Sequence, residues 1–317
     1  HFPLHAPEEE IAKYRGKYRI GWDKLREQRH ARQIEMGLLD ARWKLSPQDP
    51  ALAAWKDIGK KEAWDFDWID RWYVKGLTME EAGDADLWDH KMATYAAMID
   101  RMDQNIGRLV EKLRAQGELE NTLILFLSDN GGCAQSNTDI TDIPPGPVNS
   151  WQCCGPPWAN AQNTPFKRYK RWNYEGGIAT PLIAHWPKRI KGGGITHEMG
   201  HVVDIMATCL DVAGAEYPEE YDGHKVQPLV GKSLVPVLDG GTRDGHETFC
   251  WQFHPHQAIR HGDWKAVSTG DGPWELYNLA EDRTELNNRA DAEPDRVRAM
   301  GKAWDAWAKQ VGARKRG

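Results

Sequence analysis

The segment that most constrains the fold is a helix pattern leading directly into an unbroken apolar strand. Residues 87–116 repeat apolar side chains every three or four positions, the spacing of an amphipathic helix. Gly117 ends this pattern, and the apolar run 123–127 follows after a short polar turn. Such a run predicts a strand buried on both faces. Together they indicate an α/β protein whose sheet is covered by helices.

The predicted strand runs into the sequence Asp129-Asn130-Gly131-Gly132. Asn-Gly is a favoured hairpin turn, but residues 131–147 lack the apolar alternation of a return strand. The other interpretation is a ligand site, because open α/β sheets bind ligands beyond the carboxyl ends of their strands. The oxygen atoms of Asp129 and Asn130 suit Ca²⁺ or Mg²⁺ better than zinc. The residues alone leave both interpretations open.

A second polar cluster lies at residues 166–174. It holds Lys167, Arg168, Lys170 and Arg171 among four aromatic residues, just before a Gly-Gly pair. This mixture predicts a basic side chain in a half-buried site that binds an anion. A basic loop packed by its own aromatic residues is the alternative. Oxygen ligands for a metal together with a positioned lysine indicate a sulfate or phosphate ester as substrate.

Composition limits the class of protein. A chain of 317 residues with 40% hydrophobic content can form one large domain and a small one. The net charge of -6 gives no electrostatic footprint for nucleic acid, and no apolar run is long enough for a transmembrane helix. The five cysteines match neither a disulfide framework nor a zinc pattern.

The pattern changes near residue 240. Before it, a second strand is expected at residues 180–187 and a helix at 201–215. After it come short strands separated by turn residues, with a hairpin across His261, Gly262 and Asp263, and a closing helix at 294–311. We therefore expect domains at 1–240 and 241–317. The aromatic, acidic segment 64–76 is either a wall of the site or simple packing.

Five stretches of the sequence, taken in order, resemble type I sulfatases of the arylsulfatase kind. They are HFPLHAP, YAAMIDRMDQNIGRLV, TLILFLSDNGG, TPFKRYKRWNYEGGIATPLIAHWP, and AIRHGDWKAV with WELYNLAEDRTELNN. The resemblance implies the α/β fold of the alkaline phosphatase superfamily: a mixed sheet sandwiched by helices, with a small C-terminal α+β domain containing an antiparallel sheet. It also implies hydrolysis of sulfate esters by a formylglycine and a divalent cation, usually Ca²⁺, with Mg²⁺ as the alternative.

The resemblance assigns four site residues. Asp129 and Asn130 match the later pair of metal ligands, and Lys170 matches the lysine that holds the sulfate. His1 matches a histidine that contacts the sulfate and protonates the leaving oxygen. The Cys-x-Pro-Ser-Arg motif that yields formylglycine does not occur, and the chain opens without Met. The nucleophile is therefore expected upstream of residue 1, and the fragment alone is expected to be inactive.

Two other functions remain as alternatives. One is a phosphodiesterase or phosphonate monoester hydrolase of the same superfamily, and the other is an inactive remnant that acts as a binding or structural module. The 16 Trp residues favour a sulfated carbohydrate as the sulfate ester. The family implies a periplasmic or secreted protein, with no nucleic-acid or membrane partner expected. The sequence does not indicate an oligomeric state.

Overall fold

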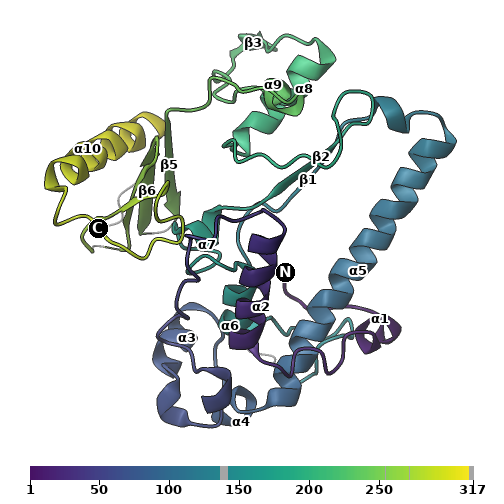
Figure 1. The fold of residues 1–317 in the computed structure, drawn as a ribbon, viewed down its shortest axis with the longest axis vertical. Coiled ribbons are helices and arrows are strands. Elements are labelled where there is room, and N and C mark those ends of the chain that lie inside the picture. The colour runs from purple at the N-terminus through teal and green to yellow at the C-terminus, as the bar shows by residue number, and fades with distance from the viewer. Residues whose placement is uncertain (136–141, 254, 271, 314–317) are drawn as a thin grey trace. The chain divides into compact units, whose positions relative to one another are not determined.

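The computed structural model describes residues 1–135, 142–253, 255–270 and 272–313 (Figure 1). Its internal contacts form two compact units that alternate along the chain. The first holds residues 1–107, 130–180 and 250–317, and the second holds 108–129 and 181–249. The division at residue 240 stays a prediction. None of the described helices is both long enough and apolar enough to cross a membrane.

The first unit is largely helical in its N-terminal and middle parts. Its helices are α1 (Glu8–Ala12), α2 (Trp22–Glu35), α3 (Phe66–Trp72), α4 (Met79–Ala82), the first part of α5 (Ala85–Ala115), α6 (Gly155–Gln162) and α7 (Glu175–Ile178), with 3-10 turns at Trp55–Asp57 and Lys61–Ala63. The long helix α5, drawn in blue in Figure 1, confirms the helix expected at 87–116, and the boundary between the units falls within it.

Tryptophan side chains form the centre of this unit. The rings of Trp88 and Trp158 lie edge-on to Trp22, at 5.5 and 5.4 Å, and all three side chains are buried. Their indole N–H groups are all paired with backbone carbonyls; that of Trp22, for example, donates to Ala53 O at 3.1 Å. Burial with the polar tip satisfied is what tryptophan requires in a core. These residues are therefore packing groups and do not line a sugar-binding surface.

The second unit contains the strand that was expected to be buried. β1 (Ile124–Leu127) pairs antiparallel with β2 (Leu182–His185), and the described part of this sheet has two strands. Phe126 is 41% exposed and Ile183 is 61% exposed. The prediction of burial on both faces is wrong for this chain, because a two-stranded ribbon has too little around it to cover both faces.

The hairpin interpretation of Asn130-Gly131 is also wrong. The partner of β1 is β2, which begins more than fifty residues later, and the described residues after Gly132 form no return strand. Residues 136–141 of the predicted polar loop lie outside the described residues. The helix expected at 201–215 is α8 (Val203–Ala213), which Gly214 ends in the left-handed conformation. The second unit also holds the 3-10 turn Leu119–Asn121, β3 (Glu220–Tyr221), β4 (His224–Lys225) and α9 (Val235–Leu238).

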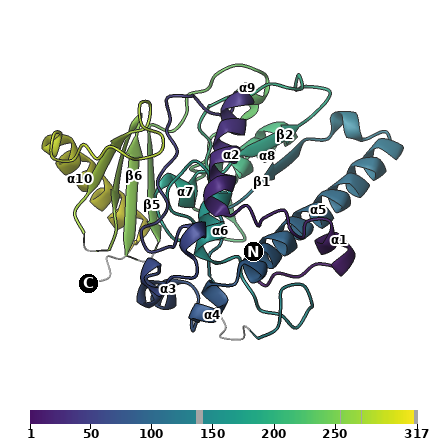
Figure 2. The same cartoon turned by 60° about the horizontal axis from the view of Figure 1, so that its bottom comes forward.

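The C-terminal part forms the expected antiparallel sheet and closing helix. The sheet runs in the order β5 (Thr248–Phe253), β6 (His256–His261), β7 (Trp264–Ser268) and β8 (Glu275–Asn278). His261 pairs with Trp264 around Gly262, which has φ 56°, so the predicted hairpin is confirmed. Helix α10 (Pro294–Val311) lies along one face of this sheet (Figures 1 and 2) and buries Trp304 against it.

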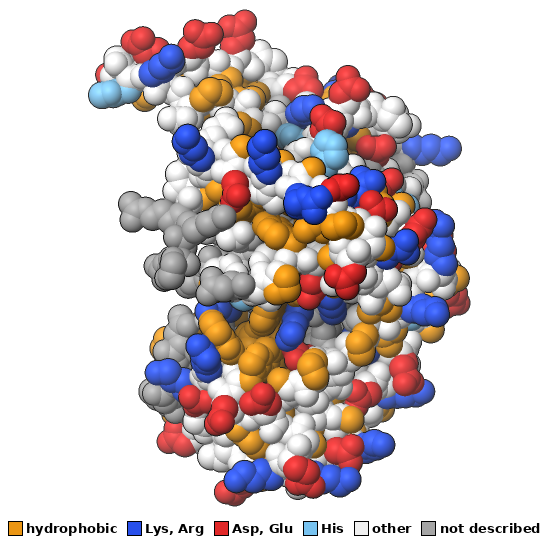
Figure 3. Space-filling model, turned by 90° about the vertical axis from the view of Figure 1, so that its left-hand side faces the viewer, with side chains coloured by type: hydrophobic (Ala, Val, Ile, Leu, Met, Phe, Trp, Pro, Cys, Tyr) orange, Lys and Arg blue, Asp and Glu red, His pale blue; other side chains and the backbone are white. Residues whose placement is uncertain are grey.

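Charge is distributed without a large single-sign area on the face drawn in Figure 3, where acidic and basic side chains are interspersed. The most heavily hydrogen-bonded carboxylate of the second unit is Asp204, at the start of α8. It is buried and accepts from the N–H groups of His201 and Lys232, both at 2.9 Å, from Arg243 Nη2 at 2.8 Å and from His246 Nε2 at 2.6 Å. Burial alone would raise the pKa of Asp204, but these hydrogen bonds outweigh it and hold the pKa at about 2.

We expect Asp204 to make this unit sensitive to acid. Its pKa of about 2 lies below the ordinary value of about 3.9, so the unfolded state binds the proton first as the pH falls. The stabilisation, about 2–3 kcal/mol, is thus present above about pH 4 and is lost as the pH falls towards 2. Urea unfolding should show the free-energy difference between wild type and Asp204→Asn shrinking from about pH 5 to pH 2.5. A constant difference would contradict this account.

Candidate functional site

Four glycines join the loop after β1 to helix α7. Gly131 lies against Gly176 and Gly177, and its N–H donates to Gly177 O at 3.0 Å. Gly132 lies against Ala159 and Gln162. A Cβ on Gly131 would lie 1.9 Å from Gly176 O, and one on Gly177 would lie 1.9 Å from Trp172 O. None of the four has a left-handed φ. Glycine is therefore required here by the closeness of two backbones and not by a special backbone angle.

A neighbouring backbone hydrogen bond holds Lys170 against the segment that begins at Asn130. The backbone N–H of Lys170 donates to Gly132 O at 3.1 Å, and Gly132 N–H donates to Asn163 Oδ1 at 2.9 Å. The first unit thus holds Asn130 and Lys170, forty residues apart in sequence, on backbone segments that are directly hydrogen-bonded. Asp129, which is exposed, is the last residue of the second unit's segment and is bonded directly to Asn130.

His1 lies beside Lys170. The Lys170 Nζ to His1 Nε2 distance is 3.2 Å, although 169 positions separate the two residues. His1 Nδ1 is 2.6 Å from the carbonyl oxygen of Phe2, so Nδ1 carries the proton and the Nε2 lone pair faces the lysine. The residues after His1 are held against the loop that contains Gln152, because Leu4 N–H donates to Gln152 O at 3.0 Å. The structure therefore brings together two of the residues assigned by resemblance.

The basic cluster divides into two pairs of residues with different roles. Lys167 lies 4.1 Å from the Tyr174 ring centroid and donates to Tyr277 Oη at 2.9 Å, and burial lowers the pKa of Lys167. Arg168 forms an ion pair with the buried Asp49. These two cations are used in packing. No described carboxylate is within ion-pair distance of Lys170 or Arg171. The packing interpretation therefore holds for Lys167 and Arg168, and the anion-binding interpretation stays a prediction for Lys170 and Arg171.

A buried ion cluster supports this loop from the C-terminal sheet, and sequence reasoning missed it. Lys265 Nζ on β7 is 2.8 Å from Glu175 Oε1 and 2.9 Å from Glu285 Oε1, and Arg283 Nη2 is 2.7 Å from Glu175 Oε2. Burial opposes ionisation of Glu175, but Arg283 and Lys265 outweigh it and lower its pKa to about 2. Burial raises the pKa of Glu285. The signal available in the sequence was a lysine at an inward position of an apolar strand.

Asp129 and Asn130 fit a hard divalent cation in donor chemistry. The Asn130 amide is oriented by its Nδ2, which donates to Gly131 O at 2.8 Å. Ca²⁺ takes six to eight oxygen ligands, so this pair can supply only part of a shell. Within the described residues, no group of three or more His, Cys, Asp or Glu side chains is arranged to hold a metal. The two residues thus fit Ca²⁺ or Mg²⁺ as contributors to a shell that other ligands complete.

The adjacent cysteines Cys153 and Cys154 do not match an activated nucleophile. All five are free thiols. Cys153 and Cys154 are buried, and burial raises the pKa of both, that of Cys154 to about 12. A thiol with a raised pKa stays protonated near neutral pH and is a poor nucleophile.

Comparison with known proteins decides the family. Residues 1–215 match the family described as Sulfatase. The chain belongs to the sulfatase family. Residues 167–302 also match the family described as N-sulphoglucosamine sulphohydrolase, C-terminal. The arylsulfatase-like resemblance is thereby confirmed.

Two curated relatives of this sulfatase are similar over most of its length. An uncharacterized sulfatase of Schizosaccharomyces pombe is 32% identical over 98% of the chain and 56% of the relative. An arylsulfatase of Klebsiella aerogenes is 30% identical over 75% of the chain and 49% of the relative. The chain thus spans about half the length of these curated relatives.

Solved structures support the fold. Ps i-CgsB aligns over 90% of this chain and 54% of its own, with a TM-score of 0.53 and 23% identity. BT4656, solved with its substrate D-glucosamine-2-N,6-O-disulfate, aligns over 79% of this chain and 47% of its own, with a TM-score of 0.50 and 24% identity. The predicted α/β class with an antiparallel C-terminal sheet is confirmed.

The glycine contact generates a stability prediction. Gly131→Ala places a Cβ 1.9 Å from Gly176 O, so one of the two backbones must move. We expect the free energy of unfolding to fall by at least about 1–3 kcal/mol, as for other overpacked positions. Gly59→Ala is the control, because a Cβ there meets nothing within 4 Å. Urea unfolding curves should separate the two variants, and equal curves would show that the contact does not constrain the site.

Proposed function

We propose that this chain supplies the sulfate-binding and leaving-group side of an active site that hydrolyses sulfate esters. The observation that carries the proposal is the 3.2 Å contact between His1 Nε2 and Lys170 Nζ, in a loop where Lys170 has no described carboxylate partner. Membership of the sulfatase family supports it, as do relatives named arylsulfatase and N-acetylgalactosamine-6-sulfatase.

The two side chains have complementary tasks in this proposal. The Lys170 ammonium binds the sulfuryl oxygens and stabilises the negative charge that develops on them. A bound anion beside His1 favours the protonated imidazole, since opposite charges stabilise each other. Nε2 then carries a proton towards the leaving oxygen, which is a poor leaving group unless it is protonated.

The remaining chemistry requires a divalent cation and a nucleophile. Asp129 and Asn130 would hold a divalent cation, Ca²⁺ with Mg²⁺ as the alternative, which polarises the sulfate when bound. We propose that the nucleophile is a formylglycine in a segment that precedes His1. A periplasmic or secreted location is proposed from the family.

A sulfated carbohydrate is the proposed substrate class. Two similar proteins support it: an N-acetylglucosamine-6-O-sulfatase of Bacteroides thetaiotaomicron, 28% identical over 72% of this chain, and BT4656, solved with a sulfated glucosamine as its substrate. Trp68 and Trp72 on α3 are half-buried, unlike the core tryptophans, so part of each ring remains available to a ligand.

The proposal predicts a large loss of activity when Lys170 is changed. In the full-length protein, Lys170→Ala should lower kcat for a chromogenic sulfate ester by about 10²- to 10³-fold, the usual effect of removing a charge-stabilising donor. Asp129→Ala should lower activity and weaken its restoration by Ca²⁺ after chelation. Lys44→Ala, at an exposed position of the first unit, is the matched control.

Two results would contradict the proposal. Full activity in both Lys170→Ala and Asp129→Ala would remove these residues from the site. Faster turnover of a phosphate diester or phosphonate monoester than of the sulfate ester, with the same dependence on Lys170, would keep the site and change the reaction class.

A further inference from the structure

Arg171, next to Lys170, is a cation that the proposed sulfate chemistry does not use. It is half-buried. Two other cations of the basic cluster have carboxylate partners: Arg168 pairs with Asp49, and Lys167 Nζ lies 3.8 Å from Glu275 Oε2. Where the structure describes the chain, no carboxylate is within ion-pair distance of Arg171. A guanidinium without a carboxylate partner, one residue from a sulfate-binding lysine, is available to an anionic ligand.

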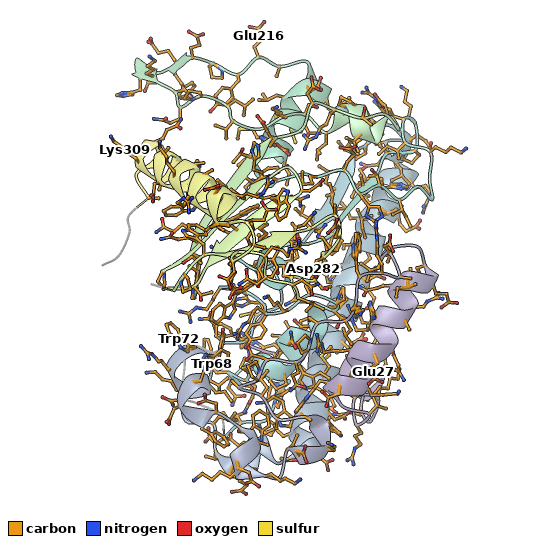
Figure 4. The ribbon with its side chains drawn as sticks, turned by 60° about the vertical axis from the view of Figure 1, so that its left-hand side comes forward. Glu27, Trp68, Trp72, Glu216, Asp282 and Lys309 are labelled. Atoms are coloured by element: carbon orange, nitrogen blue, oxygen red, sulfur yellow. The ribbon has the colours of Figure 1, made fainter. Side chains whose placement is uncertain are left out.

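A second arginine lies on the same aromatic ring. The guanidinium carbons of Arg71 and Arg171 lie 5.2 and 5.6 Å from the centroid of Trp72, and Arg171 Nη1 donates to Trp72 O at 2.8 Å. Arg71 is exposed and, like Arg171, has no ion-pair partner among the described carboxylates. Figure 4 shows Trp72 on α3, near Trp68. An arginine that stacks on an indole loses less freedom when it binds an anion.

The backbone at Arg171 indicates that its side chain is used. Arg171 has φ 88° and Arg168 has φ 66°, left-handed values that are uncommon outside glycine. Glycine would adopt them without strain. The ion pair with Asp49 accounts for the side chain of Arg168. Among the described residues, the side chain of Arg171 contacts the ring and carbonyl of Trp72, and neither contact uses its charge in an ion pair.

None of the acidic residues of α3 and its N-cap, Asp65, Asp67 and Asp70, forms an ion pair with Arg71 or Arg171. Asp70 Oδ1 accepts the backbone N–H of Gly76 at 2.8 Å, and Asp65 Oδ1 caps the helix by accepting from Trp68 N–H at 2.9 Å. The whole chain carries a net charge of -6, so a polyanionic ligand gains no general attraction to it. Binding of such a ligand depends on local cations that lack carboxylate partners.

We propose that Arg71, Trp72 and Arg171 form a second anion-recognition subsite beside Lys170, which takes the negatively charged neighbour of the sulfated sugar. The proposal rests on the proposed function and narrows its substrate to polyanionic carbohydrates. Planar guanidinium groups bind a sulfate or a carboxylate through paired N–H donors. Consecutive Cα atoms lie about 3.8 Å apart, and the proposal assigns Lys170 and Arg171 to adjoining parts of one ligand.

The test compares three disaccharides in which the same sulfated sugar is linked to a neutral, a carboxylated or a second sulfated sugar. Calorimetric titration of the full chain, at one fixed ionic strength, gives the ratio of affinities for charged and neutral neighbours. We expect a ratio of about ten or more in the wild type, the usual effect of a charge-assisted contact. The charged disaccharide with the larger ratio identifies the preferred anion.

Arg71→Gln and Arg171→Gln should each bring this ratio close to one. Both changes keep the Cβ and an N–H donor and remove the charge, so they add no strain at φ 88°. Arg71 is exposed, so Arg71→Gln tests the subsite even if Arg171→Gln alters folding, which a thermal unfolding curve would show. Lys61→Gln, an exposed change shortly before α3, should keep the wild-type ratio.

Failure of the subsite and failure of the proposed function give different results. Suppose that Lys170→Ala abolishes binding of the neutral-neighbour disaccharide. If the affinity ratio is then one in the wild type, or stays at its wild-type value in both arginine variants, only the subsite is wrong. If binding of that disaccharide does not depend on Lys170, the proposed function fails and the subsite fails with it.

Discussion

The rest of the site depends on a backbone-to-backbone contact between two glycine pairs. At Gly131 and Gly177, a single added carbon would lie 1.9 Å from a carbonyl oxygen, closer than any real contact. This contact fixes the segment that begins at Asn130 against the loop that carries Lys170, because Gly132 O accepts the N–H of Lys170. Asn130 and Lys170 are therefore positioned by main-chain geometry, which is more rigid than positioning by long side chains.

The C-terminal sheet has a physical role in this arrangement. Strand β7 presents Lys265 to Glu175, which lies directly before the second glycine pair, and to Glu285. Lys265, Glu175 and Glu285 are all buried. Breaking such a buried pair leaves an unpaired charge, which costs about 3–5 kcal/mol. The ion cluster therefore ties the glycine contact to the sheet, so the small sheet supports the Lys170 loop as well as closing the chain.

The sequence predicts those features whose signals are local. The helix at 87–116, the hairpin at Gly262 and the closing helix follow from periodicity and turn residues, and the structure confirms them. The exposure of β1 could not be predicted, because an apolar run reads the same whatever covers it. The pairing of His1 with Lys170 came from the family resemblance, since no spacing rule links residues 169 positions apart. The division of the basic cluster depends on Asp49 and Glu275, more than a hundred residues away from the cations they meet.

That division explains how a cluster of four cations can be selective. Four unpaired charges in five positions would attract any anion with little preference for geometry. Asp49 neutralises Arg168, and the tyrosine rings and Glu275 surround Lys167, so these two hold the loop in shape. The charge left for a ligand is confined to Lys170 and Arg171, the first directed at His1 and the second held on Trp72. In the proposed site, the ion pairs of the other two cations thus replace a general attraction for anions with selectivity for a ligand that has two negative charges at the positions of Lys170 and Arg171.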